Sequence, residues 1–384
     1  MATPLPAGFR AHVANVGIKD DTDDFVVIVA DRPCSAAAVF TRSRFAGPSV
    51  VLSRASVADG TLRAYVVVSK NANVATGTQG MEDAREVIRG VAHAYDLGES
   101  DVLIASTGVI GRRYPMDRMR AHLASLAPPL PLTEVEPAAL GIMTTDTFAK
   151  VSSTMVDDVT IVGFAKGVGM IEPDMATLIA LFMTDAAVDA PELDAMFRRV
   201  IDRTLNAVSV DTDTSTSDTA AVMASGAAGS VDLARLEVGL HEVALALTRM
   251  IARDGEGATK LLVVTVDGAR DDAQAKRVAK AIVNSPLVKT AVHGADPNWG
   301  RVAMAVGKCA DDIDIDQDRV VIRFGEQQLY PGATEEADLV ELTKYLAGDE
   351  VLIHVSLGIG EGAFTVYGCD LSDGYVRINA DYTT

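Results

Sequence analysis

The chain has no apolar run long enough to cross a membrane. None of its 384 residues lies in an uncharged apolar stretch of about 18 residues, which is roughly the length of a transmembrane helix. The first ten residues, MATPLPAGFR, contain no apolar segment of signal-peptide length. We therefore expect a cytoplasmic protein.

Cysteine is scarce, and its placement excludes two kinds of site. The three residues, Cys34, Cys309 and Cys369, are far apart, odd in number and match no metal-ligand spacing. We expect them to be small buried apolar residues and not a disulfide framework.

Positive charge is also in short supply. The chain has 34 lysines and arginines against 53 aspartates and glutamates, a net charge of −19. Such a surface does not neutralise phosphates, so nucleic acid is not an expected partner. The acidic excess mainly favours solubility.

Familiar catalytic and metal-binding signatures are missing as well. His241 and Glu242 do not begin an HExxH motif, and no serine stands in a G-x-S-x-G motif. The acidic stretch at 312–318 resembles a calcium loop, but its sixth position is Gln317 and its twelfth is Arg323, where glycine and glutamate are required. We expect a polar surface strand there, a tight turn at GIGEG (358–362), and no metal.

The pattern of apolar residues predicts a mixed α and β chain. Continuous or alternating apolar runs predict strands, three- to four-residue spacing predicts helices, and the two types occur in blocks, which favours a layered α+β architecture. The expected strands include 24–32, 35–42, 49–57, 62–70, 101–106, a hairpin at 151–167, a doubly buried strand at 177–186, and 260–269. The expected helices include 81–98 with Gly98 as C-cap, regions near 115–126 and 135–145, 191–208, 231–255, 272–294 interrupted at Pro286, and 335–348.

A threonine stands where a Gly- and Pro-containing loop meets a buried strand. The loop covers 167–176, and Thr177 opens the apolar run TLIALFMTDA. Threonine often begins strands because it is β-branched. Alternatively, cleavage of the bond before Thr177 would give it a free α-amine, whose pKa of about 7.7 suits a base for its own hydroxyl.

A second candidate is STGVIG (106–111), which follows a predicted strand. Thr107 offers a hydroxyl and Gly108 a backbone N–H, and such donors stabilise an oxyanion by roughly 3 kcal/mol each in a transition state. The alternative is an ordinary turn between a strand and a helix.

These residues lie within a pattern that resembles the ornithine acetyltransferases of arginine biosynthesis, also called glutamate N-acetyltransferases. The resemblance covers essentially the whole chain. The matching segments are KNANVATG (70–77), IASTGVIG (104–111), IMTTDT (142–147), AKGVGMIEPDMATL (165–178), TDTSTSDT (212–219), DGEGATKL (254–261), VNSPLVKTAVHGADPNWGR (283–301) and YVRINADYTT (375–384).

The resemblance implies a layered α/β/β/α sandwich, as in self-processing aminopeptidases, with a smaller C-terminal α+β domain. We expect the sandwich over residues 1 to about 280 and the smaller domain over about 281–384. It also implies self-cleavage between Ala176 and Thr177 into an α chain, 1–176, and a β chain, 177–384, with two of each in a heterotetramer.

The resemblance further assigns residues to the site. Thr177 would be the nucleophile, and Thr107 and Gly108 would form the oxyanion hole. The implied substrate contacts are Thr144, Lys166, Thr177, Glu256, Asn379 and Thr384. The implied reaction moves an acetyl group from N²-acetyl-L-ornithine to L-glutamate through an acetyl-threonine ester, without a cofactor.

Three alternatives stay open from the sequence. Water could replace glutamate, which would make the protein an amidohydrolase or aminopeptidase. A paralogue could serve a secondary pathway with another acceptor. Acetyl-CoA could also be a donor, although we favour recycling alone. Glu172 and Asp174 depart from the neutral residues frequent in the family and could alter cleavage or substrate preference.

Overall fold

The computed structural model describes residues 2–172, 178–332 and 335–381, which form two compact units. The first unit is Met1–Asn206 with Asp213–Leu247, and the second is Ala207–Thr212 with Thr248–Thr384. The second unit therefore includes residues 248–280, which we expected in the first domain. These residues belong to the second unit because their strand is central in its sheet.

The first unit contains one eight-stranded sheet and most of the long helices. Its strand order is β4-β3-β2-β9-β7-β6-β5, and β1 also pairs with β2. The strands are β1 (Phe9–Ala14), β2 (Phe25–Phe40), β3 (Thr61–Val68), β4 (Val102–Ser106), β5 (Lys150–Val156), β6 (Val159–Lys166), β7 (Ile179–Ala186) and β9 (Thr219–Gly229). The helices are α1 (Pro48–Ser56), α2 (Gly77–Tyr95), α3 (Met116–Leu123), α4 (Glu136–Gly141), α5 (Ala190–Arg203) and α6 (Leu233–Arg253), which ends in the second unit.

Strand β2 belongs to two stacked layers of this sheet. Its first half pairs with β1 and β3, and its second half pairs with β9, with a change of register between Val29 and Cys34. One apolar core lies between the layers and takes side chains from β2, β3 and β4 on one side and from β6, β7 and β9 on the other. The Tyr65 hydroxyl of β3 crosses this core to the Phe182 carbonyl of β7, at 3.2 Å.

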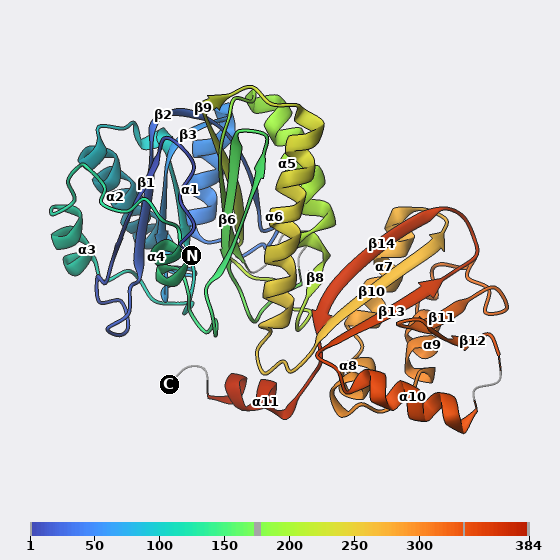
Figure 1. The fold of residues 1–384 in the computed structure, drawn as a ribbon. Helices are drawn as coiled ribbons and strands as arrows, with labels where there is room; N and C mark the ends of the chain where they lie inside the picture. Colours follow the sequence, from blue (N-terminus) through green and yellow to red (C-terminus); the bar gives the residue numbers. More distant parts are fainter. Residues whose placement is uncertain (1, 173–177, 333–334, 382–384) are drawn as a thin grey trace. The chain divides into compact units, whose positions relative to one another are not determined.

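Helices cover the outer face of each layer. Helices α2 and α3 pack on the first layer in a second apolar core. On the other layer, Phe182 of β7 meets Phe197 of α5 edge to face, with ring centroids 5.6 Å apart. Figure 1 shows α2 and α3 on one side of the strands and α5 and α6 on the other. The expected α/β/β/α sandwich is confirmed.

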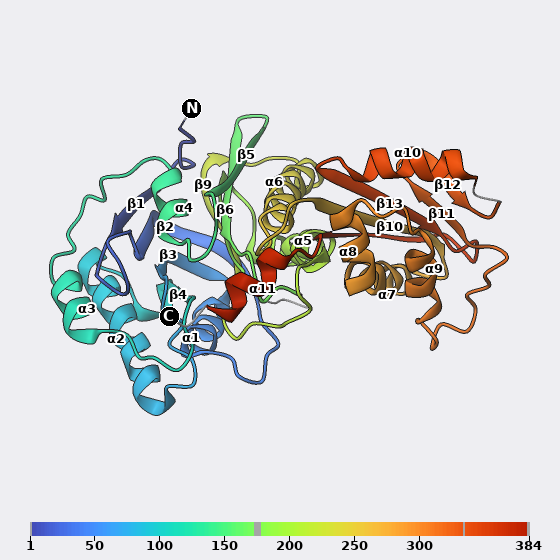
Figure 2. The ribbon, with the colours of Figure 1, turned by 90° about the horizontal axis from the view of Figure 1, so that it is seen from below.

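The second unit is a smaller α+β sandwich. Its sheet order is β12-β11-β13-β10-β14-β8, and α10 lies on the face opposite α7, α8 and α9 (Figure 2). The strands are β8 (Val208–Ser209), β10 (Leu261–Ala269), β11 (Val321–Phe324), β12 (Gln327–Tyr330), β13 (Glu350–Ser356) and β14 (Gly362–Cys369). The helices are α7 (Asp272–Val283), α8 (Pro286–Gly294), α9 (Gly300–Gly307), α10 (Glu336–Leu346) and α11 (Asp373–Ala380).

Several local predictions are wrong. The runs at 24–32 and 35–42, expected as two strands, form the single strand β2. The segment 49–57 is mainly helix α1, because Ser53 docks it on β4: its hydroxyl donates to the Ile104 carbonyl (2.7 Å) and accepts from the Ile104 N–H (2.8 Å). Helix α2 ends at Tyr95 and not at Gly98, because Asp96 adopts the left-handed conformation (φ 53°) that ends the helix.

The surface strand predicted at 312–318 is also wrong. This segment forms turns, because its carboxylates pair with side chains and not with a strand ladder. Asp312 accepts from Arg277 at 2.5 Å, and Asp314 accepts from Gln274 at 2.8 Å. In the described part of the chain no helix combines the length and apolarity that crossing a membrane requires, and no cluster of residues suits a metal ion.

Candidate active site

Thr107 and Gly108 follow directly after the C-terminal end of strand β4. The strand pairs in parallel with β3, and the Thr107 N–H continues the ladder by donating to the Val68 carbonyl at 3.1 Å. The Thr107 side chain is largely buried, at 8% exposure of the residue. The local structure is thus a turn at the end of a strand. Both interpretations of STGVIG, an oxyanion site and an ordinary turn, require such a turn.

Only glycine fits at position 108. Its φ is +127°, and a Cβ there would lie 2.2 Å from the Lys70 carbonyl carbon and 2.6 Å from the Asn71 nitrogen. Side chains rarely adopt this φ, and the backbone of Lys70 and Asn71 leaves no space for one. Within residues 2–172, 178–332 and 335–381, the Gly108 N–H has no acceptor, so this donor is available to a ligand.

Lys166 reaches the same turn from strand β6. It is the last residue of the strand, is 5% exposed, and its Nζ lies 3.3 Å from the Thr107 hydroxyl. Burying a positive charge is costly unless an anion or hydrogen bonds compensate it. A buried lysine beside a hydroxyl and an available backbone N–H forms an environment that favours negative charge.

Asp146 supplies the compensating charge. Its Oδ1 accepts from Lys150 Nζ at 2.7 Å and from the Gly167 N–H at 2.8 Å. Burial alone would raise the pKa of Asp146, but the charges of Lys166 and Lys150 and the hydrogen bonds from Lys150 and the Gly167 N–H together outweigh burial, so the pKa is lowered. The carboxylate therefore stays ionised among its partners.

Asp146 also fixes the segment that carries Thr144. The Thr144 N–H donates to the second oxygen, Oδ2, of Asp146 at 3.1 Å. Through this carboxylate the structure connects three of the expected positions, namely Thr144, Lys166 and Thr107. Asp146 lies within the IMTTDT segment, but no role was expected for it; its four-residue spacing from Lys150 was an available signal.

Two further expected residues meet in the second unit. Asn379 Nδ2 donates to Glu256 Oε2 at 2.9 Å and to the Tyr375 carbonyl at 3.1 Å. Gly257 has φ +71°, and a Cβ there would lie 2.3 Å from the Tyr375 nitrogen. The residue after Glu256 must therefore be glycine for α11 to pack against this part of the backbone. The amide orients the Glu256 carboxylate, a group suited to bind an ammonium.

The remaining expected site residues, Ala176, Thr177 and Thr384, lie outside the described residues. The nucleophile and the cleavage site therefore stay predictions.

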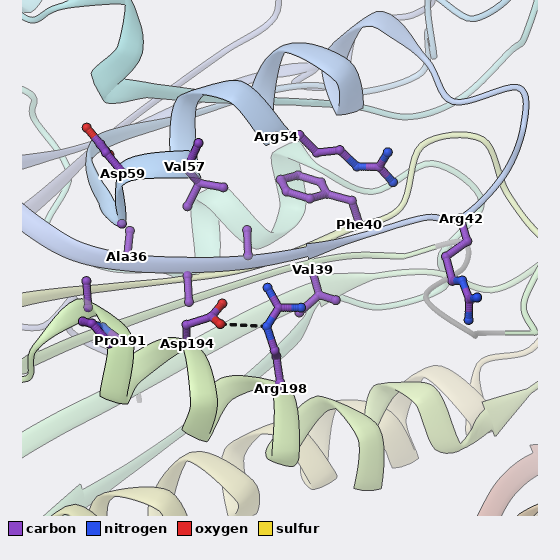
Figure 3. A pocket seen from close by; sticks show the side chains of 15 residues that line it. Ala36, Val39, Phe40, Arg42, Arg54, Val57, Asp59, Pro191, Asp194 and Arg198 are labelled. Atoms are coloured by element: carbon purple, nitrogen blue, oxygen red, sulfur yellow. Dashed lines mark hydrogen bonds and ion pairs between the residues drawn. The ribbon is translucent and has the colours of Figure 1, made fainter.

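A separate groove runs along an open edge of β2. Strand β3 pairs with β2 only as far as Ser35, whereas β9 pairs on the other edge as far as Phe40. The groove, with a volume of about 680 Å³, lies there between α1 and α5, and Arg198 pairs with Asp194 on its wall (Figure 3). Its lining includes none of the expected site residues that the structure describes.

The cysteines fit their expected structural role in part. Cys34 and Cys369 are buried, Cys309 is half-buried, and all three are free thiols. Burial raises the pKa of Cys34 to about 12, which makes a reactive thiolate unfavourable at this position.

Comparison with known proteins gives full-length matches. Glutamate N-acetyltransferase Oat2 of Streptomyces clavuligerus is 60% identical over 390 residues, which cover 100% of this chain and 99% of the relative. Arginine biosynthesis bifunctional protein ArgJ 2 of a Nostoc species is 54% identical over 383 residues, covering 100% of this chain and 99% of the relative.

Solved structures also match. The crystal structure of arginine biosynthesis bifunctional protein ArgJ from Bacillus halodurans is 41% identical, covers 52% of this chain and 96% of that chain, and has a TM-score of 0.48. A sequence model described as the ArgJ family matches residues 10–384. The chain belongs to the ArgJ family.

Proposed function

We propose that the protein is a glutamate N-acetyltransferase that moves an acetyl group from N²-acetyl-L-ornithine to L-glutamate in arginine biosynthesis. Family membership and the names of the full-length relatives support this reaction. The observation that carries it is the turn at Thr107 and Gly108, with its available N–H and the buried Lys166 beside it. This arrangement suits the negative charge that develops on a carbonyl oxygen during acyl transfer.

The first half-reaction forms an ester on Thr177. The α-amine of Thr177 takes the proton of its own hydroxyl, and Oγ attacks the acetyl carbonyl carbon. The Thr107 hydroxyl and the Gly108 N–H donate to the resulting oxyanion. When the tetrahedral intermediate collapses, the C–N bond to ornithine breaks, the departing nitrogen takes the proton from the Thr177 ammonium, and the acetyl-threonine ester remains.

The second half-reaction runs the same steps in reverse, with a different amine in place of ornithine. The amine of glutamate attacks the ester carbonyl and passes a proton to the Thr177 amine. The C–O bond then breaks, Oγ recovers its proton, and N-acetyl-L-glutamate leaves. The ester itself stores the acyl group, so the scheme uses no cofactor.

The other family positions bind substrate in this proposal. The positive charge of Lys166 attracts a substrate carboxylate or the oxyanion, and Thr144 lies on the segment that Asp146 fixes. The Glu256 carboxylate, held by Asn379, suits the δ-ammonium of ornithine. Thr384 is assigned only by resemblance.

The nucleophile exists only after cleavage between Ala176 and Thr177, which would give chains 1–176 and 177–384. We propose that two of each form the working heterotetramer in the cytoplasm. Mass spectrometry of active protein should find a fragment beginning at Thr177, and Thr177→Ala should remain uncut. Active material that consists of one unbroken chain would refute the scheme.

Kinetics test the reaction and separate the competing donors and acceptors. Initial rates with acetylornithine and glutamate should show parallel ping-pong lines, whereas a ternary-complex pattern would contradict the ester. Release of acetate from acetylornithine without glutamate would indicate a hydrolase. Screening acetyl-CoA and other N-acyl amino acids as donors decides between recycling and a wider donor range.

A further inference from the structure

The segment KNANVATG (70–77) has no part in the proposed reaction, yet its backbone is unusual. It leads from β3 into α2, and three of its non-glycine residues, Lys70, Asn73 and Ala75, have positive φ angles of 68°, 51° and 57°. This left-handed conformation is unfavourable for a residue with a Cβ, although asparagine tolerates it better than most. Such residues persist only where their surroundings enforce the conformation, and they cluster at functional sites.

The start of this segment is joined to the turn that contains Gly108. The Val109 N–H donates to the Lys70 carbonyl at 3.4 Å, and the Val109 carbonyl accepts from the Ala72 N–H at 3.1 Å. Gly108 packs so closely on the same backbone that a Cβ there would lie 2.5 Å from the Lys70 Cα. The main chain of Lys70 therefore sets the position of the Gly108 N–H.

The side chain of Lys70 is held by the loop that precedes β2. It is 7% exposed, and its Nζ donates to Asp20 Oδ1 at 2.7 Å and to the Thr22 carbonyl at 2.9 Å, and also contacts the Thr22 hydroxyl. An ammonium group has three donors, so these three acceptors occupy all of them. The hydrogen bond from Lys70 lowers the pKa of Asp20, which keeps this carboxylate ionised at neutral pH.

The loop that holds the ammonium is itself fixed to the protein. Asp20 Oδ1 also accepts from the Thr22 N–H at 2.9 Å. The buried Asp24 carboxyl accepts from the Val16 N–H at 2.7 Å, and the Asp24 carbonyl accepts from the Ser69 N–H at 2.9 Å. The acceptors of the lysine therefore lie at defined positions, and the loop is attached to the main chain directly before the lysine.

We propose that Lys70 is a positioning residue for the oxyanion site: Asp20 and Thr22 hold its ammonium, which keeps its backbone left-handed and so fixes where the Gly108 N–H points. The inference rests on the proposed function, because it needs this N–H to donate to the oxyanion. In this proposal Lys70 acts through its main chain and does not itself contact the reacting atoms.

The residue type at position 70 supports this role. Glycine would adopt the same φ without steric strain, and the nearby positions with positive φ, 77, 108 and 111, are all glycines. Glycine permits such a conformation but does not enforce it, because it has no side chain to anchor. A lysine whose ammonium is held by Asp20 and Thr22 enforces it.

Lys70→Met and Lys70→Gly separate the backbone conformation from the charge. Methionine is of similar length but cannot donate to Asp20, so the backbone should leave the left-handed conformation and displace Gly108. We expect kcat to fall about 100-fold with little change in KM, as for a misplacement of about 1 Å. Glycine accepts the conformation without strain, so Lys70→Gly should keep kcat within about tenfold of wild type.

Asp157 provides a matched control. It too is a charged residue with a positive φ, 55°, and its carboxylate pairs with Arg235 at 2.7 Å. It lies in the turn between β5 and β6, at the end of β6 opposite Lys166. Asp157→Met and Asp157→Gly should change the melting temperature without a difference in kcat between them. Melting curves of all four variants allow kcat to be expressed per folded and cleaved enzyme.

Asp20→Leu tests the anchor without altering position 70 or 108. The Asp20 side chain is 48% exposed, so the substitution should leave the fold intact. We expect kcat to fall about tenfold, because the Thr22 carbonyl still accepts from the ammonium. The double variant Lys70→Met with Asp20→Leu should stay within about twofold of Lys70→Met, since Asp20 acts only through the lysine. Additive losses would contradict this anchor.

Hydrogen exchange measures the same coupling without any substrate. The Val109 amide, which is bonded to the Lys70 carbonyl, should exchange its hydrogen about tenfold faster in Lys70→Met than in wild type. In Asp157→Met its rate should equal that of wild type, because the β5–β6 turn does not contact this amide.

Three results would overturn the proposal. Wild-type kcat together with wild-type hydrogen exchange at Val109 in Lys70→Met would exclude positioning. A loss of kcat in Lys70→Gly as large as in Lys70→Met would assign the effect to the ammonium itself, and a loss confined to KM would assign Lys70 to substrate binding. Failure of the proposed function looks different: cleaved wild-type protein would transfer no acetyl from acetylornithine to glutamate. Hydrogen exchange at Val109 would then still decide whether Lys70 holds the turn.

Discussion

Gly108→Ala should disable the proposed oxyanion site while leaving the fold largely intact. The added Cβ would lie 2.2 Å from the carbonyl carbon of Lys70 and 2.5 Å from its Cα. To reach the 3.4 Å of an ordinary contact, the two backbone segments must separate by about 1.2 Å. The turn at Thr107 cannot absorb this shift elsewhere, since the Thr107 N–H is bonded to Val68 and the Val109 N–H to Lys70.

A displacement of this size removes the Gly108 N–H from hydrogen-bond reach of the oxyanion. One such donor contributes about 3 kcal/mol to the transition state, so kcat should fall by roughly 100- to 1,000-fold. The loss should be in kcat more than in KM, because the donor acts on charge that develops only during the reaction.

Gly111→Ala is the matched control. Gly111 also has a positive φ, +83°, but a Cβ there would meet nothing within 4 Å. It should cost roughly 1–2 kcal/mol of stability from the left-handed backbone alone and leave kcat within about threefold. The assay is initial-rate acetyl exchange from acetylornithine to glutamate, with mass spectrometry of the fragment beginning at Thr177. Wild-type kcat in cleaved Gly108→Ala, or equal losses in the two variants, would refute the reasoning.

Other predictions concern charge. Asp146→Asn should reduce the free energy of unfolding by about 3–5 kcal/mol, measured with urea, because it removes the ion pair between Asp146 and the fully buried Lys150 side chain. Because the pKa of Asp146 is lowered in the folded protein, its contribution to the free energy of unfolding is fully present above the unfolded pKa of about 3.9. This contribution is lost as the pH falls through the folded pKa. Asp146→Asn should therefore weaken the fall in the free energy of unfolding at acid pH. Lys166→Met should lower kcat about 100-fold in acetyl exchange if it supports the oxyanion region, and unchanged kcat would exclude that role. Glu256→Gln should raise KM for acetylornithine about tenfold, and an equal effect on an N-acetyl donor without a side-chain ammonium would contradict the assignment.

Local pattern predicted the strands and helices whose apolar spacing is simple. All eight residues of β7 are buried, as the continuous apolar run indicated, and the β5–β6 hairpin turns at the two aspartates. Pro286 does begin a new helix, α8, with Ser285 as its N-cap. In these segments the burial of each residue follows from its neighbours in sequence.

Contacts distant in sequence decided the elements that pattern missed. Helix α1 buries polar as well as apolar residues, because the Ser53 hydroxyl hydrogen-bonds to the backbone of Ile104 on the edge strand β4. The spacing of its apolar residues alone therefore resembles that of a strand. The two runs at 24–32 and 35–42 are one strand because β2 must cross from one layer of the sandwich to the other. Neither fact is visible without the partner strands.

The sequence likewise predicted only some of the residues of the candidate site. Thr107, Gly108 and Lys166 were expected, and the structure brings them to one turn. Asp146 was given no role, because an aspartate in a loop sequence looks the same whether it is solvated or buried. Only the fold shows that the Asp146 carboxylate is buried and accepts from Lys150 and the Gly167 N–H.

The register of three adjacent strands explains how a cut chain could keep a working site. Ile179 at the start of β7 pairs with Lys166 on β6 and with Thr219 on β9. The proposed cleavage lies just before β7, so the new terminus would stay attached to a strand that is hydrogen-bonded on both edges and buried along its whole length. Breaking the peptide bond before Thr177 removes none of the strand pairing between β7 and β6. Strand β6 would belong to one product chain and β7 to the other. Strand pairing can therefore hold the two chains together and keep the strand that follows the proposed nucleophile between β6 and β9.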